Sequence, residues 1–288
     1  MEEHATDAMR TSRRQFIRHP NGQVTSYFYD SYVDPWRLAE TILIQHGFGR
    51  TGEHFYHWVP ALARKYNVIR RELRGHGGSS YPKLAQHDSY DYSPATIIDE
   101  LKDTLDQLGV EKVHFIGEST SGMLAEIFAA TYPDRVNSVV VCSSPTYLPQ
   151  AALDFFAFGF DSWPEACRKL GSRGWAERLS AASGTVGGDP EYVKWWTDMV
   201  SVSDGEGLAG YARFLSKLDS RPYLGRIQAP VLILCPTNSA VVTVESMEEL
   251  AGQVSNSKLE RIESPGHEIY AESEHKCLER VLGFLQDV

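Results

Sequence analysis

One serine lies where an apolar strand pattern gives way to a helical one. The strand pattern ends in Gly-Glu-Ser-Thr-Ser at residues 117–121, and apolar residues at helical spacing follow over 123–128. This arrangement is typical of a nucleophile elbow, a turn so tight that the positions two before and two after the serine must be small. Gly117 and Ser121 meet that requirement. Ser119 is therefore the candidate nucleophile, and the alternative is an ordinary strand–loop–helix connection with a capping serine.

A serine hydroxyl at neutral pH is a poor nucleophile and needs a base. His267 is the candidate, because it follows a predicted strand over 258–262 and a Pro265-Gly266 turn, and precedes the last predicted helix. A histidine on a loop is usually only solvated, and the other nine histidines of the chain lack this setting. The order of nucleophile and base along the chain favours a catalytic role for His267.

Acyl chemistry also needs two N–H donors to hold the developing oxyanion. One candidate is the backbone of Thr120, directly after the serine, and the other is the backbone of Phe48. Phe48 belongs to a His-Gly-Phe-Gly segment at 46–49, which follows a predicted strand over 41–45. The alternative for that segment is a simple glycine-rich turn. A second glycine-rich segment, at 74–80, lacks the Lys-Ser/Thr of a phosphate loop and is interpreted as a structural turn.

The composition fits one globular α/β domain with an inserted subdomain. The chain has 288 residues, of which 42% are hydrophobic and 23% charged, and a net charge of −10. An acidic chain without a basic run is a poor nucleic-acid binder, so a small-molecule substrate is expected. The oligomeric state stays open, with a homodimer as one option. No metal or cofactor motif is found, and we expect four buried, reduced thiols, at Cys142, Cys167, Cys235 and Cys277.

The first 14 residues are polar and lack the apolar core of a signal peptide, so we expect them to be disordered. No apolar run is long enough to cross a bilayer, and the prediction is a cytoplasmic protein without membrane contact.

Strand and helix patterns alternate along the chain. Further strands are predicted over 14–19, 23–29, 67–73, 136–142 and 231–235, and helices over 53–65, 94–108, 244–254 and 273–285. The alternation predicts a mainly parallel sheet covered on both faces, with an antiparallel edge formed by the first two strands. Strand patterns are missing over 146–223, which is helical and rich in aromatic residues. We predict a core domain over 15–145 and 224–288 and an inserted helical cap over 146–223.

Taken together, these segments resemble the α/β-hydrolase fold superfamily over nearly the whole chain. The matching motifs are His-Gly-Phe-Gly at 46–49, Arg-Gly-His-Gly at 74–77, Gly-Glu-Ser-Thr-Ser-Gly at 117–122, Pro-Val-Leu-Ile-Leu at 230–234 and Pro-Gly-His at 265–267. The resemblance implies a parallel sheet flanked by helices, with Ser119 as nucleophile, His267 as base and Phe48 and Thr120 as oxyanion donors. It is far less specific for the reaction, because the fold hosts many chemistries.

The sequence departs from the family at the third catalytic position. The family usually carries an aspartate after the strand that is 231–235 in this chain, and Ser239 stands at its place. Some relatives place the acid one strand earlier, as do fungal lactone hydrolases that open zearalenone. This chain shares with them a Pro-Thr pair at 145–146 but has Ser143 near the place of their glutamate. A smaller departure is Glu72, where an aspartate is usual, which we interpret as structural.

Three explanations for the missing acid remain open. Ser239 or Asn238 holds the histidine by a neutral hydrogen bond, Glu118 reaches the imidazole, or a cap carboxylate such as Asp154 folds in. Glu118 is also compatible with a buried structural role. A neutral group in place of the acid can lower turnover by about 10⁴. Three functions are therefore considered for this chain. They are a serine hydrolase for an ester or lactone of a small, largely apolar substrate, a lyase or proton-transfer enzyme acting on a secondary metabolite, and a ligand receptor.

Overall fold

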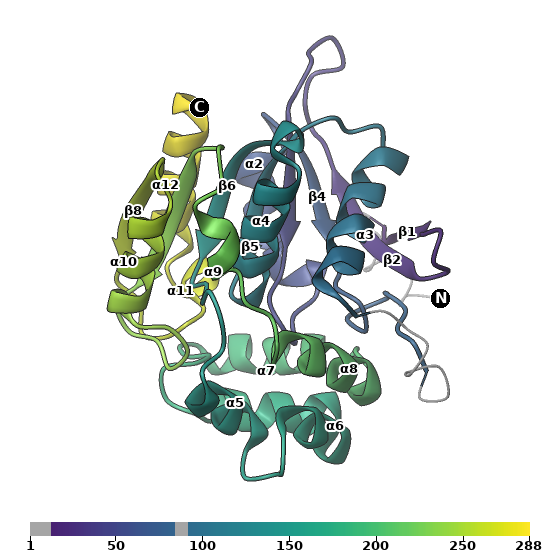
Figure 1. The fold of residues 1–288 in the computed structure, drawn as a ribbon, viewed down its shortest axis with the longest axis vertical. Coiled ribbons are helices and arrows are strands. Elements are labelled where there is room, and N and C mark those ends of the chain that lie inside the picture. The colour runs from purple at the N-terminus through teal and green to yellow at the C-terminus, as the bar shows by residue number, and fades with distance from the viewer. Residues whose placement is uncertain (1–12, 84–91) are drawn as a thin grey trace.

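A computed structural model of the protein describes residues 13–83 and 92–288 (Figure 1). Most of the N-terminal segment predicted to be disordered, residues 1–12, lies outside these ranges. Arg14 is held in place, because its guanidinium pairs with Glu72 across 3.1 Å. In the described ranges no helix is both long and apolar enough to span a lipid bilayer.

The described residues form one eight-stranded sheet in the order β1-β2-β4-β3-β5-β6-β7-β8. The strands are β1 (Gln15–Arg18), β2 (Val24–Asp30), β3 (Thr41–Gln45), β4 (Asn67–Arg71), β5 (Val113–Glu118), β6 (Val136–Cys142), β7 (Val231–Pro236) and β8 (Ser257–Ile262). Pairs β1–β2 and β2–β4 are antiparallel, and every pair from β4 to β8 is parallel. The predicted mainly parallel sheet with an antiparallel edge is confirmed.

Helices cover both faces of the sheet and one of its ends (Figure 1). They are η1 (Gly52–Trp58), α2 (Val59–Leu62), α3 (Pro94–Gln107), α4 (Thr120–Thr131), η3 (Pro133–Arg135), α5 (Gln150–Ala157), α6 (Trp163–Ser180), α7 (Pro190–Val200), α8 (Gly205–Leu215), α9 (Arg221–Leu224), α10 (Val244–Gln253), α11 (Ile269–Glu272) and α12 (Glu274–Asp287). The helix predicted over 53–65 is present over 52–62 but differs in type: a 3₁₀-helix leads into a short α-helix there. Pro60, which has no backbone N–H, lies in the first turn of α2.

Alternating side chains on the strands decide which helices cover which face. Leu43 of β3 packs in the core beneath α3, α4 and α10, whereas its neighbours Ile42 and Ile44 pack beneath η1, α2, α11 and α12. Strands β5, β6 and β7 divide their side chains in the same way. Because both faces are buried, these strands read as continuous apolar runs.

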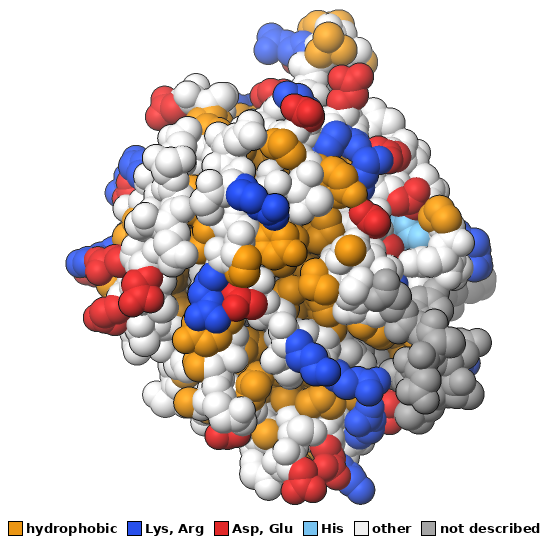
Figure 2. All heavy atoms as spheres, in the orientation of Figure 1, with side chains coloured by type: hydrophobic (Ala, Val, Ile, Leu, Met, Phe, Trp, Pro, Cys, Tyr) orange, Lys and Arg blue, Asp and Glu red, His pale blue; other side chains and the backbone are white. Residues whose placement is uncertain are grey.

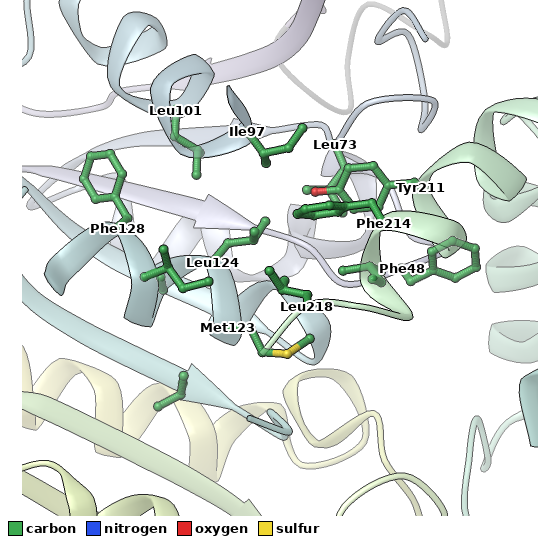
Figure 3. Close-up of a cluster of buried hydrophobic side chains, with 14 of the residues drawn as sticks. Phe48, Leu73, Ile97, Leu101, Met123, Leu124, Phe128, Tyr211, Phe214 and Leu218 are labelled. Carbon is green, nitrogen blue, oxygen red and sulfur yellow. The ribbon is translucent and has the colours of Figure 1, made fainter. Parts of the chain in front are cut away.

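Figure 3 shows that the core on the α3 and α4 side continues into α8. Ile97 of α3 and Leu124 of α4 belong to the same buried cluster as Tyr211 and Phe214 of α8. Helix α8 is therefore joined to the sheet domain by a shared apolar core.

We use the term cap helices for α5, α6, α7 and α8, which gather at one end of the sheet (Figure 1). They pack onto the loop that follows β3, where the ring of Phe48 lies 4.4 Å from that of Trp163 and 5.0 Å from that of Trp175. They also meet the turn after β4: a Cβ added to Gly75 would lie 2.5 Å from the carbonyl oxygen of Gly207. Loops at this end of the parallel strands therefore lie under the cap helices.

The face shown in Figure 2 carries acidic and basic side chains interspersed with apolar ones. All four cysteines are buried and none forms a disulfide.

Candidate active site

Ser119 lies in a strained backbone conformation between β5 and α4. Its φ of 50° and ψ of −129° fall in a region that side-chain-bearing residues rarely adopt. A Cβ on Gly117 would lie 2.4 Å from the carbonyl oxygen of Ser121, and one on Gly122 would lie 2.1 Å from Oγ of Ser144. The strand-to-helix turn therefore tolerates only glycine at these two positions. The sequence pattern indicated this steric demand at Gly117 and placed the second one at Ser121, one residue before Gly122.

The imidazole of His267 lies against this serine, with Nε2 2.9 Å from Oγ of Ser119. His267 is on the loop between β8 and α11, and its backbone is held on both sides. Its N–H donates to the carbonyl of Thr185 at 3.0 Å, and its carbonyl accepts from the hydroxyl of Ser143 at 2.9 Å. Thr185 belongs to the loop between α6 and α7, so a cap segment helps to place the histidine.

Ser239 contacts the other ring nitrogen of the histidine: its Oγ lies within hydrogen-bonding distance, 2.9 Å, of Nδ1 of His267. The same oxygen accepts the backbone N–H groups of Val241 at 3.1 Å and Val242 at 3.2 Å. The cap loop supports this arrangement too, because the N–H of Ala240 donates to the carbonyl of Gly184 at 2.9 Å. Ser119, His267 and Ser239 thus form one hydrogen-bonded chain.

These contacts bear directly on the tautomer of the imidazole. A hydroxyl oxygen has two lone pairs and one proton. With both lone pairs of Ser239 used by Val241 and Val242, its proton is left to donate to Nδ1 of His267. Nδ1 is then the acceptor and Nε2 carries the ring proton, whereas a base for Ser119 needs a bare Nε2. The neutral group at the acid position therefore favours the tautomer that is wrong for proton abstraction.

The other candidates for orienting the histidine lie elsewhere. Asn238 is exposed and donates from Nδ2 to the carbonyl of Pro265 at 2.7 Å. Asp154 is exposed on α5 and accepts from Gln150. Both ring nitrogens of the histidine are taken up by serine hydroxyls.

Glu118 is fully buried beside the nucleophile and faces the loop after β3. Its Oε2 accepts the N–H of Gly47 at 2.6 Å and lies 4.0 Å from Nε of Arg50. Burial raises the pKa of Glu118, and the charge of Arg50 opposes that shift. This carboxylate therefore supports the Gly47 backbone.

Burial, together with the nearby charge of Arg50, lowers the pKa of His267 to about 3. The protonated imidazolium that forms when Ser119 gives up its proton has no hydrogen-bonded carboxylate to stabilise it. The site thus holds a neutral histidine throughout the ordinary pH range and makes its protonation unfavourable.

The two predicted oxyanion donors lie side by side. The N–H of Phe48 donates to Oγ1 of Thr120 at 3.2 Å, and Thr120 is the first residue of α4, where backbone N–H groups have no helical acceptor. The hydroxyl of Thr120 is therefore the present acceptor of the Phe48 N–H. This hydroxyl would have to turn away before one oxyanion could accept from the N–H groups of both Phe48 and Thr120.

Arg50 and Glu268 are buried charges that the sequence reasoning missed. They form an ion pair, and Arg50 also donates to the carbonyl of Phe48 at 2.6 Å. Glu268 further accepts from Trp196 of α7 at 3.3 Å and from the hydroxyl of Tyr270 at 2.5 Å. Their positions in the sequence could have indicated a place at the site, since Arg50 directly follows the 46–49 segment and Glu268 directly follows His267.

Two buried histidines brace the loop after β3. His46 accepts the N–H of Leu73 at 3.2 Å, and His76 accepts the N–H of Gly49 at 3.0 Å, both through Nε2. Each Nδ1 lies 2.8 Å from a backbone carbonyl, which fixes the tautomers. Burial lowers the pKa of both rings to about 3. The 74–80 segment is thus joined to the candidate oxyanion loop by neutral hydrogen bonds.

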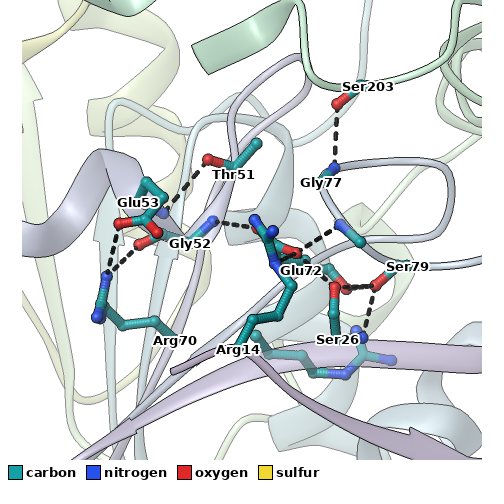
Figure 4. Close-up of polar contacts among 12 residues, drawn as sticks. Arg14, Ser26, Thr51, Gly52, Glu53, Arg70, Glu72, Gly77, Ser79 and Ser203 are labelled. Carbon is teal, nitrogen blue, oxygen red and sulfur yellow. Dashed lines mark hydrogen bonds and ion pairs between the residues drawn. The ribbon is translucent and has the colours of Figure 1, made fainter. Parts of the chain in front are cut away.

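Glu72 joins this turn to the N-terminal strands, as Figure 4 shows. Its carboxylate accepts the N–H groups of Gly52 at 3.2 Å and Gly78 at 2.8 Å, as well as the hydroxyl of Ser26. Arg14 supplies the opposite charge. The contacts of Glu72 are those of a structural residue.

The cavity at Ser119 is small and largely apolar. Its volume is about 10 Å³, which is room for about one water molecule. It is lined by Phe48, Arg50, Ser119, Thr120, Phe156, Trp163, Trp175, Leu179, Thr185, Val241 and His267. Any organic substrate reaches Ser119 only when the cap helices or these side chains move.

A family model described as the alpha/beta hydrolase fold matches residues 40–274. The chain belongs to this family. This α/β-hydrolase is 26% identical over 206 residues to 3-oxoadipate enol-lactonase 2 of Acinetobacter baylyi, covering 69% of this chain and 72% of that protein. It is 29% identical over 184 residues to fluoroacetate dehalogenase of Burkholderia sp, covering 56% and 59%.

Solved structures show the same fold. The crystal structure of the enol-lactonase from Burkholderia xenovorans LB400 superposes on the α/β-hydrolase with a TM-score of 0.83, at 20% identity, covering 94% of this chain and all of that one. The esterase from Exiguobacterium antarcticum has a TM-score of 0.78 at 16% identity, covering 95% of this chain. At these identities the likeness establishes architecture, and the chemistry has to be argued from the site.

Proposed function

We propose that this α/β-hydrolase is a serine hydrolase that cleaves a carboxylic ester or lactone of a small, largely apolar substrate. The observation that carries the proposal is the 2.9 Å contact between Ser119 at the strained turn and Nε2 of His267. The relatives include both an enol-lactonase and a fluoroacetate dehalogenase, so the choice of an ester or lactone rests on the serine nucleophile.

The residues would divide the reaction into two acyl-transfer steps. Oγ of Ser119 attacks the carbonyl carbon while its proton passes to Nε2 of His267, and the N–H groups of Phe48 and Thr120 hold the oxyanion. The proton on Nε2 then goes to the leaving alkoxide, which gives an acyl-enzyme. Water, deprotonated by the same nitrogen, hydrolyses the acyl-enzyme and frees Ser119.

The serine at the acid position makes this a slow hydrolase. Nε2 has to be bare before attack, so Nδ1–H has to donate to Ser239, which must then turn its own proton away and give up one of its two backbone donors. A neutral group at the acid position of a serine protease lowers turnover by about 10⁴. We also propose that α5–α8 act as a cap that moves to admit substrate, because the cavity beneath them, about 10 Å³, is too small for an organic molecule.

The test is hydrolysis of p-nitrophenyl esters together with labelling by a serine-directed phosphonate. Ser119→Ala and His267→Ala should abolish turnover, and Ser119→Ala should also abolish labelling. Ser144→Ala is the matched control, because that buried serine donates to the carbonyl of Pro145 and not to the imidazole. Unchanged turnover in Ser119→Ala contradicts the proposal.

A second candidate is a lyase or proton-transfer reaction at the same site. The tautomer that Ser239 favours suits such a reaction when His267 donates a proton from Nε2, and this chemistry needs no acyl-enzyme. Turnover that depends on His267 but persists in Ser119→Ala would support this reading.

A further inference from the structure

Trp163 lines the cavity at Ser119 and carries a hydrogen-bond donor that no described residue satisfies. Most polar side chains on its wall are paired: Trp175 donates to the carbonyl of Phe156 at 3.2 Å, and Thr185 donates to that of Leu179 at 2.6 Å. The indole N–H of Trp163 is buried and has no hydrogen-bond partner among the residues that the structure describes. Buried donors without an acceptor are rare and destabilising, so an unsatisfied one indicates that something else supplies the acceptor.

The position of Trp163 is fixed by its aromatic neighbours. Its ring stacks on Phe156, with centroids 4.8 Å apart and an angle of 30°, and meets the edge of Phe48 at 4.4 Å. Trp163 is the first residue of α6 and is 2% exposed. Phe48 also carries one of the proposed oxyanion donors, so the indole of Trp163 packs directly against a residue of the proposed reaction site.

We propose that the indole N–H of Trp163 binds a neutral oxygen of the substrate, one that is not part of the scissile ester group. This inference rests on the proposed function and names its substrate class: apolar or aromatic esters or lactones that carry an additional ether, hydroxyl or ketone oxygen. The donor selects for that oxygen because an analogue lacking it leaves the buried N–H without an acceptor.

The charges around the cavity disfavour an anionic substrate. Arg50 is the cation on the wall: it pairs with Glu268, and its Nε lies 4.0 Å from the carboxylate of Glu118 without a hydrogen bond among the described residues. The base, His267, is neutral. A substrate carboxylate would bring a third negative group to one buried guanidinium, so an acceptor without charge is preferred.

Binding to the Ser119→Ala protein tests the proposal without requiring turnover. The ligands are the 3- and 4-isomers of methoxyphenyl, ethylphenyl and carboxyphenyl acetate, measured by titration calorimetry. The better methoxy isomer should bind about 5- to 50-fold tighter than its ethyl counterpart, and the carboxy compounds should bind more weakly than the ethyl ones. Adding Trp163→Phe, which keeps an aromatic ring but removes the N–H, should erase the methoxy preference and leave ethyl binding within about twofold.

Trp175→Phe in the same background is the matched control, since its N–H is already used within the protein. It should change the methoxy and ethyl affinities by the same factor. Replacement of Trp163 by benzothienylalanine, which keeps the bicyclic shape and puts sulfur in place of the N–H, repeats the test if the smaller ring disturbs the cap.

The proposal is overturned if the methoxy preference is missing from Ser119→Ala, survives the loss of the N–H, or gives way to a carboxylate preference. It is also overturned if no compound binds. None of these results depends on hydrolysis, so they are separate from a failure of the proposed function, which shows as esterase turnover that persists without Ser119.

Discussion

Replacing Ser239 by aspartate should restore the missing acid and accelerate hydrolysis. The Ser239→Asp side chain would meet Nδ1 of His267 where the serine oxygen now lies, at 2.9 Å. The N–H groups of Val241 and Val242, now 3.1 and 3.2 Å from that oxygen, would hold the carboxylate. An aspartate accepts only, so Nδ1 has to carry the proton and Nε2 becomes the bare base that Ser119 needs.

The size of the gain follows from two opposing effects. A carboxylate at this position is worth about 10⁴ in turnover, or about 5.4 kcal/mol. Aspartate is about 1 Å longer than serine, and a misplacement of that size can cost about 10². We therefore expect kcat on a p-nitrophenyl ester to rise by between about 10² and about 10⁴.

Ser239→Asn is the matched control, because it has the size of aspartate without its charge, and it should show no such gain. Steady-state rates are compared after phosphonate titration has counted the active Ser119 in each preparation. If Ser239→Asp labels normally and is no faster than Ser239→Asn, the tautomer argument is refuted.

Three further predictions follow from buried groups. Because burial lowers the pKa of His267 to about 3, kcat/KM should stay level from pH 8 down to pH 5, and a decline centred near 6.5 would show that the histidine is not held neutral. Thr120→Val frees the N–H of Phe48, so turnover should rise by up to about tenfold while the free energy of unfolding falls by about 1 kcal/mol; a slower enzyme would mean that the Thr120 hydroxyl assists the reaction. Burial raises the pKa of Glu126 from 4.5 to about 8, and its carboxyl contacts Ser220 at 2.5 Å. The folded protein keeps this proton after the unfolded chain has lost it, so stability falls from pH 4.5 to pH 8, by at most about 5 kcal/mol. Glu126→Gln cannot titrate, so its advantage in chemical unfolding should grow over that interval, and parallel stability curves would contradict the assignment.

Much of the architecture could be read from local patterns. Apolar runs bounded by turns identify the parallel strands, because a strand buried on both faces has no polar side. The Pro-Asn-Gly turn at 20–22 identifies the antiparallel edge. The helix predicted over 53–65 differs in type from the observed one, because apolar spacing alone takes no account of the backbone N–H that Pro60 lacks.

The candidate site, too, has residues that the sequence could predict and residues that only the structure revealed. Ser119 could be singled out because the elbow requires small residues two positions before and two positions after it, a purely local demand. The role of Glu118 could not be read from the sequence, since its partners are the backbone of Gly47 and the side chain of Arg50, on a loop far away in the chain. The unsatisfied N–H of Trp163 was equally invisible, because only the packed cap shows which indoles find an acceptor.

By itself the sequence determined the fold family. It also identified the candidate nucleophile Ser119, the candidate base His267, and the absence of a carboxylate at the expected positions. These depend on residue types at short spacings, where steric rules act on neighbours along the chain. The tertiary structure decided that Ser239, rather than Asn238, Glu118 or Asp154, meets Nδ1 of His267. It also decided that the cavity at Ser119 is too small for an organic molecule. Both depend on contacts between segments far apart in sequence, and the direction of a hydrogen bond depends on every donor that converges on the same oxygen.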